Sequence, residues 1–476
     1  MVRVQACAYK VLQKKLLMPF CAIIMSMKNK VNILIFILWC VFALIGLFHH
    51  EIWRDEAQVW CLVRDMNFTD LFAATRIEGH PILWYFLLLP LAKFGLPVES
   101  MQFVSFALIG SAVAFMLLKS PFSNLEKVLV ALSAGILYFL PVIARNYALI
   151  PLAIFLVAYL YQKRSEKPYK YALSLILLSQ THSLMFAFAG MLFVFFSVEK
   201  IKEEKHIMPI ILLAINFLYL FFNFCFAGAE NMAVQNYSER DFGFAKLLYE
   251  FCYLYFRPLF ISLMPLNLFI FYGSLVVVAY SLFKQDKKIF ALFLVSFAYI
   301  FFIFAKVWFG GVAYQKAFSL LLIILFCYWV TNKEFKPLKI VFSIIFTISS
   351  LLSIPAIIDE VKYQFSGSKQ ITTYIKENLQ DKDYQFLGYL FTISPISAYL
   401  PDRQFYSARY GQPVTYMDFR RDNYKEKVSL PPIKYIVVQE DAFGFDSTGF
   451  KEIFSTDNFI IGSRKEAEVY KIYEKI

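Results

Sequence analysis

The chain has 476 residues, of which 59% are apolar and only 17% are charged. Soluble proteins carry about 45–50% apolar and about 25% charged residues, so the composition argues against a soluble enzyme, a disordered chain or a disulfide scaffold and indicates a multispanning membrane protein. In such a protein basic residues mark cytoplasmic loops, so the net charge of +12 gives an orientation and requires no nucleic-acid partner.

Residues 1–30 are predicted to form a cytoplasmic N-terminal segment. Residues 1–26 are basic and weakly amphipathic, whereas Met27-Lys28-Asn29-Lys30 stands directly before an apolar run that ends at Phe48. That second stretch is typical of an N-terminus, so we favour a start at or near Met27; a surface-lying amphipathic helix over residues 1–26 is the alternative. No small-residue cleavage site follows the apolar run, which is therefore expected to remain as an anchor.

About eleven apolar runs are long enough, or nearly so, to cross a hydrocarbon core of about 30 Å. They cover residues 31–48, 99–118, 127–144, 147–162, 170–181, 182–198, 207–226, 259–283, 289–306, 315–331 and 338–356. One further run, residues 80–93, is broken by Pro90 and is ambiguous by hydropathy alone.

The short basic loops decide that ambiguity. They are residues 119–127, 163–170, 200–205, 284–288 and 333–339. If Lys28 and Lys30 lie inside and residues 80–93 do not cross, all of these loops fall in the cytoplasm, as the positive-inside bias requires. We therefore expect a multi-pass protein of the cell membrane (an inner or plasma membrane) with about eleven crossings, a cytoplasmic N-terminus, and a re-entrant or interfacial helix at residues 80–93 on the outer face.

The orientation divides the chain into a transmembrane domain, residues 31–356, with outer loops 49–98 and 227–258, and an extracytoplasmic domain, residues 357–476. The latter is more polar and has no cysteine, since none of the seven falls after residue 327. Ser366-Gly367-Ser368 is expected to cap a helix at residues 369–379. Strands are expected at residues 384–390, 434–439, 458–461 and 467–473. These elements predict a small α/β or α+β domain.

The first outer loop carries the most informative residues. His49-His50-Glu51-Ile52-Trp53-Arg54-Asp55-Glu56 follows the first helix directly, and Glu78 and His80 close the same loop. Arg145 and Tyr147 stand at the next outer turn, and His182 at the one after. Ionisable groups at membrane level mark a functional site by default. The alternative is a solvated helix cap with an interfacial tryptophan.

Further cations fall in the other outer loops, namely Arg240, Lys246, Arg257, Lys306 and Lys316. Cations that line an outer cavity suit an anionic ligand such as a lipid phosphate. For Arg257 and Lys306 the alternative is that each side chain snorkels at a helix end.

These motifs, in this order, resemble the GT-C glycosyltransferases, which include the dolichyl-phosphate-mannose–protein mannosyltransferases and the lipid A aminoarabinose transferases. The matching features are Arg54-Asp55-Glu56-Ala57, His80-Pro81 before an apolar helix, and Ile143-Ala144-Arg145-Asn146-Tyr147-Ala148-Leu149. Residues 311–320 are similar to a late loop of uncharacterised bacterial members, although Tyr314-Gln315-Lys316 departs from their pattern. The resemblance covers about the first 200 residues; later crossings match only in layout.

The resemblance implies an α-helical polytopic GT-C fold with outer juxtamembrane helices and an outer C-terminal α/β domain. It also implies an inverting glycosyltransferase that moves a sugar from a polyprenyl-phosphate donor to a hydroxyl of a glycan, lipid or protein acceptor. Asp55 matches the catalytic carboxylate that takes the acceptor proton. Glu56 is then expected to orient the acceptor or support Asp55; the alternative is that it only caps the helix. The implied substrate-binding residues are Arg54, Glu78, His80, Arg145, Tyr147, His182, Arg257 and Lys316.

The residues leave two matters open. The sequence assigns no definite cofactor, but Glu78, His80 and His182 offer carboxylate and imidazole ligands for a divalent metal; the alternative is that they position the donor. Many crossings with charges near helix ends also fit a transporter or lipid flippase. The sequence lacks the paired repeats and broken midplane helices that are usual in transporters, so we favour the transferase.

Overall fold

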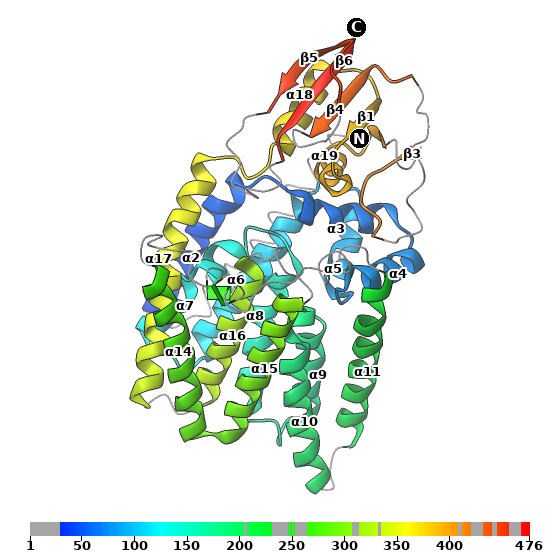
Figure 1. The fold of residues 1–476 in the computed structure, drawn as a ribbon. Helices are drawn as coiled ribbons and strands as arrows, with labels where there is room; N and C mark the ends of the chain where they lie inside the picture. Colours follow the sequence, from blue (N-terminus) through cyan, green and yellow to red (C-terminus); the bar gives the residue numbers. More distant parts are fainter. Residues whose placement is uncertain are drawn as a thin grey trace.

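The computed structural model describes residues 29–203, 207–230, 246, 248–249, 251–252, 264–306, 314–331, 335–407, 412–419, 432–439, 445–456 and 468–476. The described residues form a tall bundle of helices with a small α/β domain at one end, which we call the domain end of the bundle (Figure 1). Residues 1–28, on which the choice of start rests, lie outside this part of the chain.

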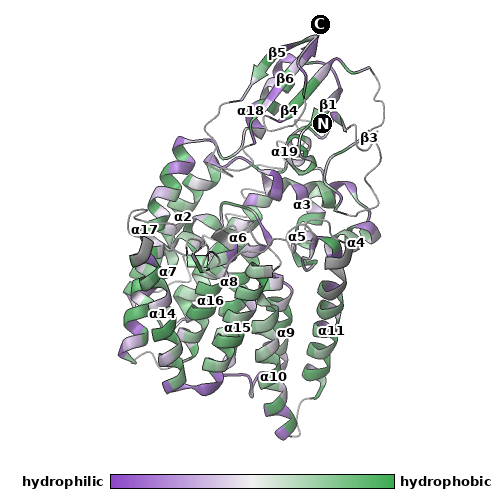
Figure 2. Ribbon diagram, in the orientation of Figure 1, coloured by the Kyte–Doolittle hydropathy of each residue, from purple (hydrophilic) through white to green (hydrophobic). Residues whose placement is uncertain are grey.

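In the described part of the chain, seven helices are long and apolar enough to cross a membrane. They are α2 (Lys30–His49), α6 (Ser100–Lys119), α10 (Phe186–Lys202) with the short turn η3 (Ser183–Met185) before it, α11 (Ile207–Glu230), α14 (Met264–Gln285), α15 (Lys287–Lys306) and α17 (Lys336–Lys362). Figure 2 shows how apolar these helices are, and large side chains such as Phe269 and Val276 are exposed on them. So much exposed apolar surface suits lipid and not water. The chain is a multi-pass helical membrane protein.

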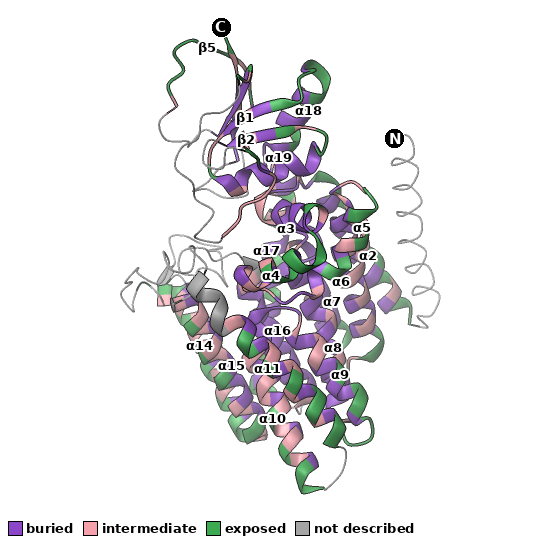
Figure 3. Cartoon of the chain, turned by 90° about the vertical axis from the view of Figure 1, so that its right-hand side faces the viewer, coloured by how far each residue is buried: buried purple, intermediate pink, exposed green. Residues whose placement is uncertain are grey.

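Shorter helices fill the interior of the bundle. They are α8 (Leu149–Tyr161), preceded by η2 (Asn146–Ala148), α9 (Pro168–Ser179) and α16 (Tyr314–Val330). Residues 317–329 of α16 are all buried, and Figure 3 shows the buried interior beneath exposed outer faces. Protein rather than lipid surrounds most of α8 and α16, so their backbone groups are protected even where the helix is short. One side of α9 is exposed instead, for example at Leu173.

The expected crossing at residues 127–144 is not one continuous helix. It consists of α7 (Asn124–Ala131), the π-helix η1 (Gly135–Phe139) and turns. A Cβ atom at Gly135 would lie 2.3 Å from the Phe318 ring of α16, so only glycine permits this approach. Irregular backbone is tolerated at membrane depth because these residues are buried in protein. Periodicity alone did not reveal the break.

Loop 49–98 forms three helices at the domain end: α3 (Arg54–Asp65), α4 (Phe68–Glu78) and α5 (Leu83–Lys93). The ambiguous run is α5, which packs against α3 beneath the α/β domain (Figure 1). Its 11 residues span about 16 Å at a rise of 1.5 Å per residue, too little for a bilayer core of about 30 Å.

The C-terminal residues form the expected α/β domain. Its elements are α18 (Ser368–Asn378), β1 (Asp383–Leu387), η5 (Leu390–Thr392), α19 (Ile393–Tyr399), β2 (Gln404–Ser407), β3 (Gln412–Pro413), β4 (Tyr435–Gln439), β5 (Phe450–Ser455) and β6 (Tyr470–Lys475). The sheet has the order β3-β2-β1-β4-β6-β5, and β1 pairs in parallel with both β2 and β4. The expected strands near residues 384, 434 and 467 are β1, β4 and β6, whereas residues 458–461 lie outside the described residues.

One buried ion network joins three segments at the domain end. His50, directly after α2, places Nε2 2.9 Å from Glu56 on α3 and Nδ1 2.9 Å from Glu360 on α17, and all three side chains are fully buried. Burial opposes a charge on the imidazole, but the two carboxylates raise the pKa of His50 to about 10. The imidazolium therefore bridges two carboxylates at neutral pH.

We expect His50→Ala to lower the melting temperature of the purified chain in detergent more than His49→Ala, because His49 is exposed and its imidazole bonds to Ile45 O of its own helix. Removing one partner of a buried ion pair costs about 3–5 kcal/mol. The pKa of His50 in the folded chain lies above its ordinary value of 6.5. The stabilisation is therefore complete below pH 6.5 and is lost as pH rises through about 10. Equal melting temperatures for the two variants would contradict this role.

Candidate active site

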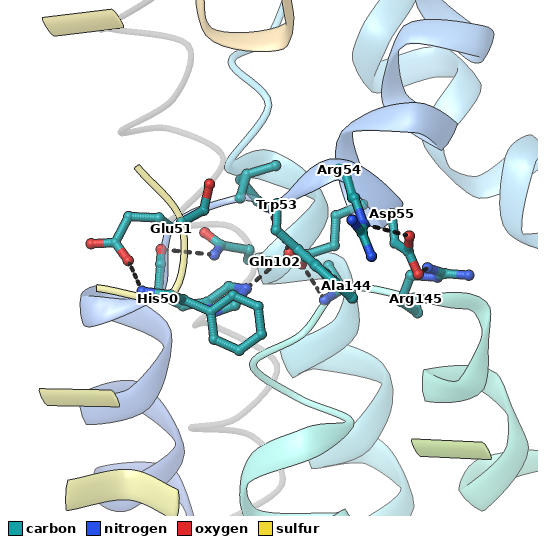
Figure 4. Close-up of polar contacts among 12 residues, drawn as sticks. His50, Glu51, Trp53, Arg54, Asp55, Gln102, Ala144 and Arg145 are labelled. Atoms are coloured by element: carbon teal, nitrogen blue, oxygen red, sulfur yellow. Dashed lines mark hydrogen bonds and ion pairs between the residues drawn. The ribbon is translucent and has the colours of Figure 1, made fainter. Parts of the chain in front are cut away.

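Asp55 lies in the first turn of α3 with its side chain 39% exposed. One carboxylate oxygen forms an ion pair with Arg145, and the other lies 3.8 Å from Nε of Arg54 (Figure 4). Burial opposes the charge, but Arg145, Arg54 and Lys316 together hold the pKa of Asp55 below its ordinary value. Asp55 is therefore an ionised carboxylate that solvent can reach.

Two of these cations come from segments that are far from Asp55 in the sequence. Arg145 stands between the irregular segment and η2, and its side chain is only 13% exposed. Lys316 lies in the first turn of α16, and its charge acts on Asp55 and His80. Together with Arg54, they place three cations around one carboxylate. This excess of positive charge favours an anionic ligand.

A layer of aromatic rings adjoins the cations. The ring of His182 stacks on Tyr147 with 4.3 Å between centroids, and it lies 5.1 Å from the ring of His80. The backbone N–H of Leu184 donates to Nδ1 of His182. Burial and the charges of Arg145 and Lys316 lower the pKa of His80 to about 3, so its imidazole is neutral at physiological pH.

Glu78, at the end of α4, is held from both sides. Its Oε1 accepts a hydrogen bond of 3.0 Å from Gln58, and its Oε2 accepts one of 2.9 Å from the Tyr85 hydroxyl. Burial raises the pKa of Glu78. The carboxylate is thus fixed in the wall of the site.

The metal set expected from Glu78, His80 and His182 does not assemble. Among the described residues no three histidine, cysteine, aspartate or glutamate side chains come together in a way that could hold a metal ion. Glu78 already uses both oxygens for Gln58 and Tyr85, and His182 uses Nδ1 for Leu184. The three side chains are neighbours in the site, but not ligands around a common point.

Glu56 is inaccessible, unlike its neighbour Asp55. Its Oε1 accepts the Ala144 N–H at 2.6 Å, and its Oε2 lies 2.9 Å from His50. The hydrogen bond from Ala144 joins Glu56, the residue after Asp55, to the residue before Arg145. It therefore positions the ion pair between Asp55 and Arg145. Of the roles expected for Glu56, the geometry fits two: helix capping, because its Oε2 accepts the Trp53 N–H at 3.3 Å, and support of Asp55. It leaves no room for contact with an acceptor.

Several buried polar atoms near Arg145 have no hydrogen-bond partner among the described residues. They include both amide atoms of Asn146, the hydroxyl of Tyr147 and Nδ1 of His80. An unpaired buried polar group costs about 1–3 kcal/mol, so such a concentration marks a place for a polar ligand or water. Asn146 was not among the expected site residues, and its only signal in the sequence was its position between Arg145 and Tyr147.

The C-terminal domain completes the site with Glu468 and Phe391, two residues that the sequence did not predict to belong to it. Glu468 Oε1 accepts the Arg54 N–H at 2.9 Å, and its Oε2 accepts the Ser366 hydroxyl. The Arg54 guanidinium lies 4.4 Å from the ring centroid of Phe391. Glu468 is 414 positions from Arg54, so no local pattern could have paired them.

A second contact links the domain to Glu78 through Gln58. The Gln58 amide nitrogen donates to Met417 O as well as to Glu78, and its oxygen accepts from Met417 N and the Ser394 hydroxyl. The substrate-binding residues expected from the sequence that the structure describes all lie around Asp55 or in the adjoining layer. Arg257 and most of loop 227–258 lie outside the described residues.

No model of a known protein family matches the chain, and a search of curated proteins finds no match either. The fold and the site define a polytopic helical membrane protein with a charged site at the junction of the bundle and an α/β domain.

Glu468 gives the junction a pH dependence that can be measured. Burial raises its pKa from 4.5 to about 7, although Arg54 and Ser366 oppose this. The folded chain therefore binds this proton more tightly than the unfolded chain, and stability falls as pH rises from about 4.5 through 7. The difference corresponds to about 3 kcal/mol.

We expect Glu468→Gln to lose less thermal stability than the parent chain between pH 5 and pH 8. The exposed Glu452→Gln provides the control and should keep the parental difference. If Glu468→Gln showed the same pH dependence as the parent chain, Glu468 would not be the responsible group.

Proposed function

We propose that the chain is an inverting glycosyltransferase of the GT-C type, which moves a sugar from a polyprenyl-phosphate donor to an acceptor hydroxyl at the outer face of the cell membrane. The observation that carries the proposal is the solvent-reachable Asp55 carboxylate paired with Arg145 and facing Lys316. This constellation lies where an apolar bundle meets a polar domain, which suits a substrate with a lipid tail and a charged head.

The proposal includes about eleven crossings and a cytoplasmic N-terminus. It is supported by a helical element in each described part of the eleven apolar runs and by the short α5, which cannot cross. The basic loop at residues 163–170 then lies in the cytoplasm, where Arg164 pairs with Glu199 of α10. The C-terminal domain lies outside.

Cysteine labelling tests this orientation. In a cysteine-free background, an impermeant maleimide added to intact cells should label Lys376→Cys in the C-terminal domain and leave Glu166→Cys unlabelled until the membrane is opened. Both positions are exposed in the structure, so burial does not explain a difference. The reverse pattern would invert the topology and remove Asp55 from the outer face.

In the proposed reaction the acceptor oxygen attacks the anomeric carbon from the side opposite the phosphate, and the configuration inverts. Asp55 accepts the hydroxyl proton as general base. The bond between the anomeric carbon and the phosphate oxygen breaks, and polyprenyl phosphate leaves with the electron pair. Arg145 and Lys316 stabilise the negative charge on that phosphate, so no second acid is needed.

Donor binding also adjusts the base. In the free protein, the ion pair with Arg145 keeps the pKa of Asp55 low, which makes the carboxylate a weak proton acceptor. A donor phosphate competes for Arg145 and Lys316 and so withdraws positive charge from Asp55. The proton affinity of Asp55 then rises when the donor is in place. The unpartnered polar atoms of Asn146, Tyr147 and His80 are available for sugar hydroxyls.

We expect Asp55→Asn to lower sugar transfer by about 10²–10⁴-fold, the usual contribution of a general base. The assay measures transfer of labelled sugar from a panel of polyprenyl-phosphate hexoses and pentoses to added glycan, lipid and protein acceptors by the purified chain in lipid nanodiscs. Expression and melting temperature should remain parental, because Asp55 is partly exposed.

Asp70→Asn is the matched control, since Asp70 is an exposed carboxylate in the same loop. Full turnover by Asp55→Asn would exclude Asp55 as the base. Movement of the intact donor across a liposome membrane, without sugar transfer and without dependence on Asp55, would favour the transporter instead.

A further inference from the structure

A second concave site lies on the C-terminal side of the same junction. It has a volume of about 480 Å³ and is bounded by α18, the segment before it, Glu51 of loop 49–98 and Phe454 of β5. Asp55 does not line it, and Glu51 and Asp55 lie at opposite ends of the cluster drawn in Figure 4. The cavity is therefore separate from the cation-rich site.

One wall of this cavity is a flat aromatic pair. Tyr374 of α18 stacks on Phe454 of β5, with 4.2 Å between ring centroids and 19° between ring planes. Both side chains are only half-buried. A half-buried aromatic surface in a cavity gives an apolar ligand face a place to pack.

The other walls are polar. Gln370, Thr373 and Asn378 contribute amide and hydroxyl groups, and Glu51, Glu377 and Lys369 contribute charges. The carboxylates outnumber the lysine, which disfavours a phosphate or another anion. The walls are also too polar for a lipid chain.

The cavity shares a wall with the candidate active site. Ser366 lines the cavity and donates to Glu468, and Glu468 accepts the N–H of Arg54, the residue before Asp55. Glu51 lines the cavity as well and accepts the Phe365 N–H at 2.8 Å. Ser366 and Glu468 therefore separate a chain held in the cavity from the helix turn that carries the proposed base.

The geometry points to a binding site for saccharide units of the acceptor, which makes the acceptor a glycan. A polyhydroxyl chain has apolar ring faces for Tyr374 and Phe454 and hydroxyl groups for the amides and carboxylates. An extended peptide fits less well, because the Tyr374 hydroxyl already occupies the Ile453 carbonyl at the edge strand β5. This inference rests on the proposed function.

Thr373→Trp tests the cavity with little risk to folding, because Thr373 is exposed on α18 and the new side chain fills the space. Lys376→Trp is the matched control: it places the same side chain on the same helix, at an exposed position that does not line the cavity. Both changes are made in the full chain carrying Asp55→Asn, so that bound sugars are not consumed.

Binding of mannotriose, cellotriose and chitotriose is measured in nanodiscs by saturation-transfer NMR and titration calorimetry. We expect at least one trisaccharide to bind, with affinity at least tenfold weaker in Thr373→Trp and unchanged in Lys376→Trp. Absence of saccharide binding, or equal binding by both variants, would overturn the inference. The inference would also be overturned if the chain bound an alanine-rich hexapeptide or inorganic phosphate in place of sugars and Thr373→Trp abolished that binding.

The two proposals fail in different ways. If the chain transfers sugar and Thr373→Trp changes neither the KM for the acceptor nor the affinity for trisaccharides, the cavity assignment is wrong and the transferase proposal stands. If Thr373→Trp abolishes trisaccharide binding but the chain with Asp55 restored transfers no sugar, the cavity assignment stands and the transferase proposal is wrong.

Discussion

The arrangement of the domain end depends on one buried imidazolium between two carboxylates. His50 contacts Glu56 and Glu360 at 2.9 Å each, and it thereby joins the end of α2, the start of α3 and the end of α17. A charge buried this deeply is stable only when its partners hold it in place. Glu56 in turn accepts the Ala144 N–H. The network therefore fixes the distance between the two backbone segments that carry Asp55 and Arg145.

The same junction explains why the C-terminal domain belongs to the site. α17 runs from the bundle to the segment before α18, so the network that fixes α17 also fixes where the domain begins. Glu468 then accepts the first N–H of α3, and Gln58 connects Met417 with Glu78. The cation-rich site and the cavity beside α18 lie on two sides of this interface. Donor and acceptor are thus proposed to meet where the two parts of the chain touch.

Much of the architecture could be predicted from the sequence because lipid imposes strong constraints. Apolar runs have to be helical, and their length has to match the bilayer. The helices α2, α6, α10, α11, α14, α15 and α17 accordingly lie where hydropathy placed them. The break after α7 could not be predicted, because it depends on the approach of Phe318 to Gly135. The strands β2, β3 and β5 were also missed. β2 and β3 have only 4 and 2 residues and carry little periodic signal, and an irregularity between Glu452 and Phe454 breaks the alternation in β5.

The sequence by itself determined that the chain is a multi-pass helical protein with a C-terminal α/β domain, and it singled out most residues around Asp55. Those features follow from composition and from charge next to apolar runs, which are local properties. Only the tertiary structure decided that Asp55 is reachable whereas Glu56 is buried, that Glu78, His80 and His182 form no ligand set, and that Glu468 completes the site. Each of these outcomes depends on contacts between residues far apart in the chain, and hydrogen bonds and ion pairs form only where folding brings their partners within about 3 Å.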